Sequence, residues 1–121
     1  MIKKIGIFIA LILVGISSIY LYLTREQSIK FYTYMPQEFE VCGDKISIKS
    51  LKYRALKKWF KLNENGWKNT PASYVPNYIF SSNSMVVNMQ PSSVVVNYQV
   101  GNSWHQVIKS AKTGGLIAVC E

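Results

Sequence analysis

The longest apolar stretch of the sequence lies at its beginning. Residues 5–23 carry no charged side chain, with Lys3 and Lys4 before them and Arg25 after them. Nineteen helical residues reach about 28 Å at 1.5 Å per residue, close to the roughly 30 Å thickness of a bilayer core. The pattern therefore predicts a transmembrane helix at residues 5–23, behind a short cytoplasmic N-terminus at residues 1–4.

Two interpretations of this apolar run are open, an uncleaved anchor and a cleavable signal peptide. Residues 15–17, Gly-Ile-Ser, resemble a small-residue cleavage site. Against cleavage, Leu21 and Leu23 continue the apolar run. In addition, Tyr20 and Tyr22 lie where interfacial aromatic residues occur at the end of a membrane span. We therefore expect a single uncleaved anchor.

The positions after the anchor predict a tether and then a β-hairpin. Residues 24–37 are polar with interspersed aromatic side chains, and they form the predicted tether. Apolar and polar residues then alternate over residues 38–49, on both sides of Gly43 and Asp44. Alternation is typical of strands with one buried face, and a glycine suits the first position of a two-residue turn. We expect a hairpin with Cys42 at its tip.

An amphipathic helix is predicted at residues 51–63, after Ser50, which can cap its first turn. At 100° per residue, the apolar side chains gather on one broad arc that we expect to pack on the core. They are Leu51, Leu62, Ala55, Trp59, Leu56, Phe60 and Tyr53. The opposite arc holds four cations, and we name it the basic ridge: Arg54, Lys57, Lys58 and Lys61.

The last part of the chain predicts a loop followed by strands. Residues 67–77 contain two prolines and show no periodicity, which is typical of a loop. Beyond them, β-like runs separated by turn residues predict strands at 78–80, 85–90, 94–100, 103–109 and 116–120. Residues 38–121 would then form one α+β domain, with one helix packed on an antiparallel β-sheet.

The two cysteines indicate where this domain resides. Cys42 and Cys120 both follow the anchor and lie near the two ends of the domain, as expected for an oxidising compartment. A disulfide between them would close a loop of about 77 residues and stabilise the domain by roughly 4 kcal/mol. Two buried free thiols are the alternative. We expect a protein of the bacterial inner membrane whose domain faces the periplasm or the cell exterior.

The inventory of catalytic groups is small. The sequence has one histidine, His105, and six carboxylates, with no Gly-x-Ser-x-Gly motif and no nucleotide-binding glycine motif. A metal site needs three or four ligands, which a bridged cysteine pair and one histidine do not supply. Glu38 and Glu40 share one face of a strand, but no cleft is predicted beside them. We expect no cofactor, no metal and no enzymatic activity; a small cell-wall or polysaccharide hydrolase using His105 and a carboxylate is the alternative.

The charge balance indicates a binding role. The formal net charge is +8, and the basic ridge is the largest concentration of one sign. A solvated helix face would explain the ridge equally, whereas a functional ridge would contact an anionic envelope component or an acidic protein. Nucleic acid is not an expected partner of an exported, anchored domain.

A second candidate surface combines aromatic residues, which suit recognition of proteins or sugars. Its members are Trp67, Tyr74, Tyr78 and Trp104. Packing of these aromatics in the core is the alternative. The sequence thus predicts a membrane-anchored, extracytoplasmic binding protein of the bacterial envelope, such as an immunity- or inhibitor-type factor or an accessory subunit of an envelope assembly.

Overall fold

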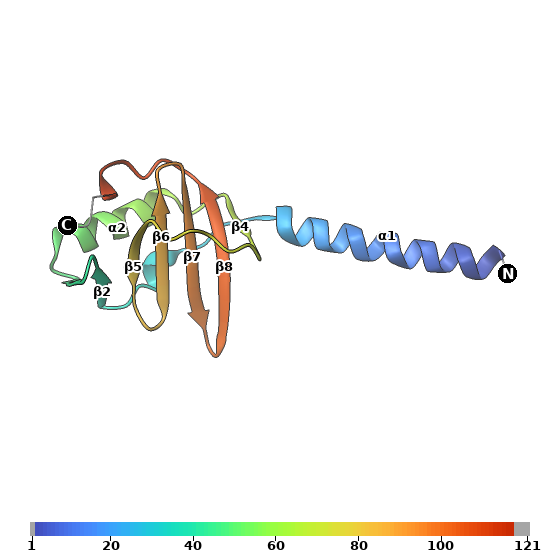
Figure 1. Ribbon diagram of the computed structural model, residues 1–121, viewed down its shortest axis with the longest axis horizontal. Helices are drawn as coiled ribbons and strands as arrows, with labels where there is room; N and C mark the ends of the chain where they lie inside the picture. The colour runs from blue at the N-terminus through green and yellow to red at the C-terminus, as the bar shows by residue number, and fades with distance from the viewer. Residues whose placement is uncertain (1, 118–121) are drawn as a thin grey trace.

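A long N-terminal helix projects from a domain built on one β-sheet (Figure 1). The computed structural model describes residues 2–117. The helix, α1 (Ile2–Thr24), contains the predicted span, and none of its residues is buried against the domain. Within the described residues, α1 is the one helix that is long and apolar enough to cross a membrane. The prediction of a single candidate membrane helix is confirmed.

The domain is an eight-stranded antiparallel sheet with one α-helix on one face, so the predicted α+β class is confirmed. The strand order is β1-β4-β8-β7-β6-β5-β2-β3. The strands are β1 (Glu26–Gln27), β2 (Glu38–Val41), β3 (Asp44–Ser47), β4 (Trp67–Asn69), β5 (Tyr78–Ser81), β6 (Met85–Gln90), β7 (Ser93–Val100) and β8 (Ser103–Ser110). The helix is α2 (Leu51–Leu62).

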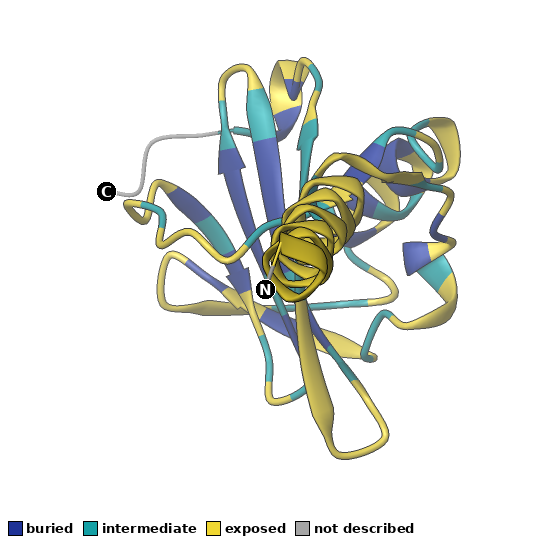
Figure 2. Ribbon diagram, turned by 90° about the vertical axis from the view of Figure 1, so that its right-hand side faces the viewer, coloured by how far each residue is buried: buried dark blue, intermediate teal, exposed yellow. Residues whose placement is uncertain are grey.

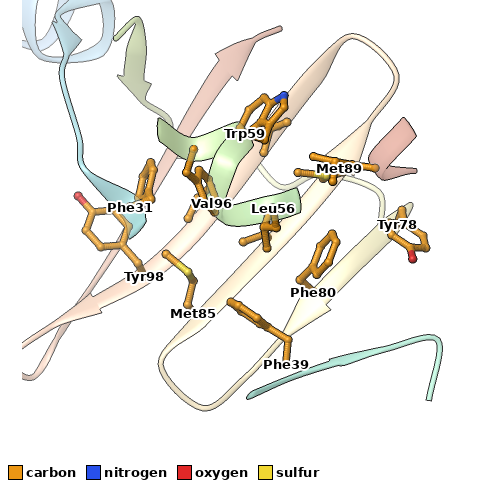
Figure 3. Close-up of a cluster of buried hydrophobic side chains, with 14 of the residues drawn as sticks. Phe31, Phe39, Leu56, Trp59, Tyr78, Phe80, Met85, Met89, Val96 and Tyr98 are labelled. Carbon is orange, nitrogen blue, oxygen red and sulfur yellow. The ribbon is translucent and has the colours of Figure 1, made fainter. Parts of the chain in front are cut away.

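Strands β5 to β8 form a meander, and successive side chains along each strand point to opposite faces of the sheet. Met85 pairs with Tyr98, and Val87 pairs with Val96, so all four project from the same face of the sheet. That inner face carries the core, and α2 packs over it. Figure 3 shows Leu56 of α2 among the buried side chains of these strands.

The core is aromatic at the end of the sheet where β4 and β8 lie. Phe31 is fully buried. Its ring centroid lies 4.8 Å from the ring centroid of Trp67 and 5.1 Å from those of Phe60 and Tyr98. Such ring pairs add about 0.5–1.5 kcal/mol each beyond the area they bury. Phe31 therefore ties the segment after the anchor to both the helix and the sheet.

This position of Phe31 differs from the expectation of a tether at residues 24–37. Glu26 pairs with Lys68 in the sheet, and Ile29 and Phe31 lie in the core. A short 3₁₀ helix, η1 (Phe31–Thr33), follows. The apolar and aromatic residues of this stretch follow no helix or strand period, so the sequence pattern did not predict that the segment folds against the domain.

The hairpin β2–β3 is present, but its turn lies one residue earlier than expected. Val41 pairs with Asp44, so the turn residues are Cys42 and Gly43. Their φ angles are 55° and 81°, the left-handed conformation that a type I′ turn needs at both positions. Gly43 supplies one of these angles without strain, and Cys42 occupies the other.

The segment predicted as a loop at residues 67–77 begins as a strand. Trp67–Asn69 forms β4, and the remaining residues, 70–77, form a crossing loop over the outer face of the sheet, from β4 on one side to β5 on the other. Gln106 Nε2 donates to the Thr70 carbonyl at 3.1 Å, and Asn88 Nδ2 donates to the Val75 carbonyl at 3.1 Å. Polar side chains on the outer face thus hold the crossing loop.

The end of the chain differs from the predicted last strand. Residues Gly114–Leu116 form a 3₁₀ helix, η2, which places Leu116 against the core. Most of the strand expected at residues 116–120 lies outside the described residues. Cys120 lies there as well, so the bond from Cys42 to Cys120 stays a prediction.

Candidate functional site

The helix α2 presents the basic ridge to solvent because its other face is bound to the core. Leu56 and Phe60 are fully buried, and Tyr53 and Trp59 are nearly so. Ser50 lies at the N-cap position, but its hydroxyl accepts from the Ser47 amide at 3.0 Å instead of capping the helix. The helix is therefore positioned by its buried stripe.

The four cations of the basic ridge line the outward side of α2, as the periodicity predicted. Arg54, Lys58 and Lys61 are exposed, and Lys57 is half-buried. Arg54 Nη2 donates to the Lys49 carbonyl at 2.8 Å, and Lys61 Nζ lies 5.4 Å from the Tyr32 ring centroid. Neither contact neutralises a charge.

No carboxylate of the described residues pairs with the ridge. The single ion pair between residues 2 and 117 joins Lys68 to Glu26 at the sheet edge, with 4.0 Å between Nζ and Oε1. Four cations on about two turns of helix, without a counter-charge from residues 2–117, create a positive potential that an anionic partner can use.

The buried arc of α2 is narrower than the sequence predicted, which leaves apolar side chains beside the ridge. Leu51 is 80% exposed, Leu62 is 75% exposed, and Ala55 is also exposed. A helix lying on a sheet buries a stripe about 100° wide, so residues at the margins of a broader apolar arc remain in solvent. The expectation that these three residues pack on the core was wrong.

Part of this apolar margin forms a shallow groove between α2 and η2. The depression has a volume of about 400 Å³. Its lining residues are Ala55, Lys58, Trp59, Leu62, Gly115 and Leu116. We call it the α2 groove. Because Lys58 belongs to both the groove and the basic ridge, cationic and apolar features meet on one surface.

The structure does not bring the four aromatic candidates together. Trp67 is fully buried and Tyr78 is 2% exposed, so both belong to the core. Tyr74 is half-buried, and its hydroxyl bonds to Thr70 Oγ1 at 2.7 Å. Trp104 alone is largely exposed, at 51%. A joint recognition surface of these residues was therefore a wrong expectation, because Trp67 lies in a strand whose inner face is covered by α2.

The two carboxylates that share a strand face, Glu38 and Glu40, lie far from the histidine of the alternative hydrolase. His105 is exposed on β8, where its ring centroid is 5.5 Å from that of Tyr98, and no described carboxylate bonds to it. Glu38 and Glu40 line a depression of about 540 Å³ beside β2. Four strand spacings separate β8 from β2, roughly 19 Å at 4.8 Å each. His105 and these carboxylates therefore cannot act on one bond.

The depression beside β2 was not foreseen from the sequence. Its walls combine the apolar residues Pro36 and Phe39 with Lys45 and residues 81–84, Ser-Ser-Asn-Ser. Among residues 2–117, no three His, Cys, Asp or Glu side chains group as a metal site.

Comparisons of the chain with protein-family models, with curated proteins and with solved structures found no match. Function is therefore argued from the surface itself. The feature that stands out is α2, where the basic ridge adjoins exposed apolar side chains.

Proposed function

We propose that this protein is a single-pass, membrane-anchored binding protein of the bacterial envelope whose domain lies outside the cytoplasmic membrane. The length and apolar character of α1 support the anchor. The presence of both cysteines after the anchor supports export, and we include a Cys42–Cys120 disulfide in the proposal. An immunity- or inhibitor-type factor and an accessory subunit of an envelope assembly both require such a tethered binding domain.

We further propose that α2 carries the binding surface and that its partner is an acidic protein. The observation behind this is the exposure of Leu51 and Leu62 beside cations that pair with no carboxylate of residues 2–117. A helix face that only meets water would place polar residues at these positions, because each exposed leucine forgoes about 1.5–3 kcal/mol of burial. A protein partner can bury the leucines while its carboxylates meet the ridge, which a bare polyanion cannot do.

Charge reversal on α2 tests this proposal. The double variant Lys58→Glu with Lys61→Glu should lose capture of its acidic partner from detergent-solubilised envelopes, as measured by cross-linking and quantitative mass spectrometry of the full chain. The fold should persist because both side chains are exposed. Circular dichroism of the purified variant checks the fold.

A matched control separates the site from overall charge. Lys30→Glu with Lys45→Glu changes the net charge equally at exposed positions outside α2. The control should retain the same partner, and raised salt should weaken capture by the wild type. Equal loss in both double variants, or no loss in either, would exclude α2 as the binding surface.

The anchored topology has its own test. A protease added outside spheroplasts should digest the domain while a cytoplasmic marker survives, and the chain should stay with membranes after carbonate extraction. Release of the intact chain by carbonate, or protection from the protease, would contradict the anchor or its orientation respectively.

A further inference from the structure

One tryptophan of the chain is exposed in a place that the α2 surface does not explain. Trp104 is 51% exposed on β8, whereas Trp59 is 9% exposed and Trp67 is fully buried. It lies on the outer face of the sheet, opposite Gln99 of β7. No aromatic ring of the described residues packs on its indole. A half-exposed indole is available for a contact outside the domain, and its neighbours decide which contact this can be.

The structure places Trp104 next to the end of the anchor. Trp104 and Tyr22 line the same small cavity, of about 130 Å³, together with Asn69 and Thr70. Asn69 Nδ2 also donates to the Tyr22 carbonyl at 3.5 Å. The β8 strand and the last turn of α1 are therefore neighbours in space.

The connection between anchor and domain is too short to let them separate. Only Arg25 lies between α1 and β1, and its amide still bonds to the Leu21 carbonyl at 2.9 Å. Strand β1 then pairs with β4, so the helix passes directly into the sheet. Figure 1 shows α1 leaving the domain beside β4, and Figure 2 looks along α1 toward this side of the sheet.

The depth of Trp104 follows from the depth of the anchor. If residues 5–23 fill the hydrocarbon core, Tyr22 lies at the outer boundary of that core, where Tyr and Trp are enriched. Trp104 borders the same cavity as Tyr22 and so lies at a similar depth. An indole suits this level, because its ring is apolar and its N–H can bond to headgroups or water.

We propose that Trp104 inserts into the headgroup region of the bilayer and docks the β8 side of the domain on the lipid surface. This proposal rests on the anchoring in the proposed function. It assigns Trp104 to a lipid contact instead of a protein or sugar site. Docking would also fix the orientation of the domain. Strand β3 lies at the opposite edge of the sheet from β1, and α2 begins at Leu51 shortly after β3. Leu51 and the start of α2 would therefore be directed away from the membrane.

Fluorescence quenching by brominated lipids tests this proposal. The full-length chain is reconstituted in vesicles of phosphatidylcholine and phosphatidylglycerol, with or without bromine near the top of the acyl chains. Brominated lipid should quench the Trp104 component, up to about one third of the emission since the chain has three tryptophans. Trp104→Phe should lose this quenching, and the two remaining tryptophans are shielded by the core.

A moved tryptophan provides the matched control. Leu51→Trp in the Trp104→Phe background places an indole at a site that is 80% exposed, roughly 30 Å across the sheet from β1. Its emission should not respond to brominated lipid. Quenching of this tryptophan as strong as that of Trp104 would show that the domain has no fixed orientation and would overturn docking.

Two failures of the experiment are distinguishable. A wild-type chain that floats with vesicles but shows no quenching would overturn lipid docking and leave the anchor intact. A chain that does not float would refute the anchor and, with it, the docking that depends on it.

Discussion

The three tryptophans of this chain differ in burial because of what surrounds each ring. The Trp67 indole has ring-centroid distances of 4.8 Å to Phe31 and 6.2 Å to Trp59, and its Nε1 donates to the Asn63 carbonyl at 2.7 Å. Trp104 has about half its surface in solvent. Residue type alone therefore does not tell the buried tryptophan from the exposed one.

Substitution of these two tryptophans should therefore have very different costs. Trp67→Ala should lower the free energy of unfolding by about 3–5 kcal/mol, because it leaves a large cavity and an unpaired Asn63 carbonyl. Trp104→Ala should change it by only about 0.5 kcal/mol. Urea denaturation of the detergent-solubilised chain measures both, and similar costs would contradict the described burial.

Two tyrosines should make the domain sensitive to alkaline pH. Burial raises the pKa of Tyr53 above its ordinary value of 10.0, and burial followed by the neighbouring Tyr34 phenol raises the pKa of Tyr98. The folded state therefore holds these protons more tightly than the unfolded state. Their contribution to stability is complete below pH 10 and is lost as the pH rises through the folded pKa values.

The double variant Tyr53→Phe with Tyr98→Phe tests this linkage. It should show a smaller decrease of the urea midpoint between about pH 9 and about pH 11 than the wild type. At neutral pH it should lose about 1 kcal/mol, because the Tyr53 hydroxyl no longer donates to the Pro36 carbonyl at 2.6 Å. Parallel pH curves for the two proteins would exclude these tyrosines as the cause.

At the scale of elements, α2 is a core helix on one side and carries the proposed binding surface on the other. The apolar arc predicted from its periodicity is wider than the stripe that the sheet can cover, so its margins remain exposed. Lys52, the one charged residue within that arc, is half-buried because its ammonium group reaches the Tyr78 hydroxyl. The helix thus tolerates a lysine at the margin of its buried stripe.

Leu56 and Leu62 provide a matched pair on this helix. Leu56→Ala should lower the free energy of unfolding by about 2–5 kcal/mol, because Leu56 is fully buried. Leu62→Ala should lower the free energy of unfolding by less than about 0.5 kcal/mol, because Leu62 is 75% exposed. The same substitution should weaken capture of the proposed partner. Thermal denaturation and quantitative cross-linking of both variants separate the two roles. Unchanged capture by Leu62→Ala would remove the α2 groove from the binding surface.

The strands show where local pattern suffices and where it fails. Alternation located β2 and β3, and apolar runs between turn residues located the meander from β5 to β8, because each of these strands is long enough to show a pattern. Local pattern failed for β1 and β4, which have two and three residues and are too short to display a period. Their place in the sheet depends on pairing across the fold, which leaves no local signal.

At the scale of the whole molecule, the two edges of the sheet have different surroundings. The edge with β1 and β4 adjoins the anchor, and the edge with β3 carries the hairpin turn at Cys42. A bond from Cys42 to Cys120 would tie this far edge to the end of the chain. The domain would then be held at the membrane on one side and by a covalent link on the other.

Reduction should therefore destabilise the domain if this bond forms. Dithiothreitol, or the variant Cys42→Ser, should lower the free energy of unfolding by roughly 4 kcal/mol, because the unfolded chain regains the entropy of the open loop. Urea denaturation with and without reductant measures the loss. Alkylation of both cysteines in the untreated protein would show that no disulfide forms.

The sequence by itself determined the candidate membrane helix, the amphipathic helix and the antiparallel class, because each is a local pattern of neighbouring apolar and polar residues. Only the tertiary structure decided which tryptophans are buried, how wide a stripe α2 covers and that Trp104 lies beside Tyr22. These features depend on contacts between distant residues, such as the bond from Asn69 to Tyr22 across 47 positions. Such contacts form because folding buries the apolar surface of all the strands at once. A short stretch of sequence contains no information about these distant partners.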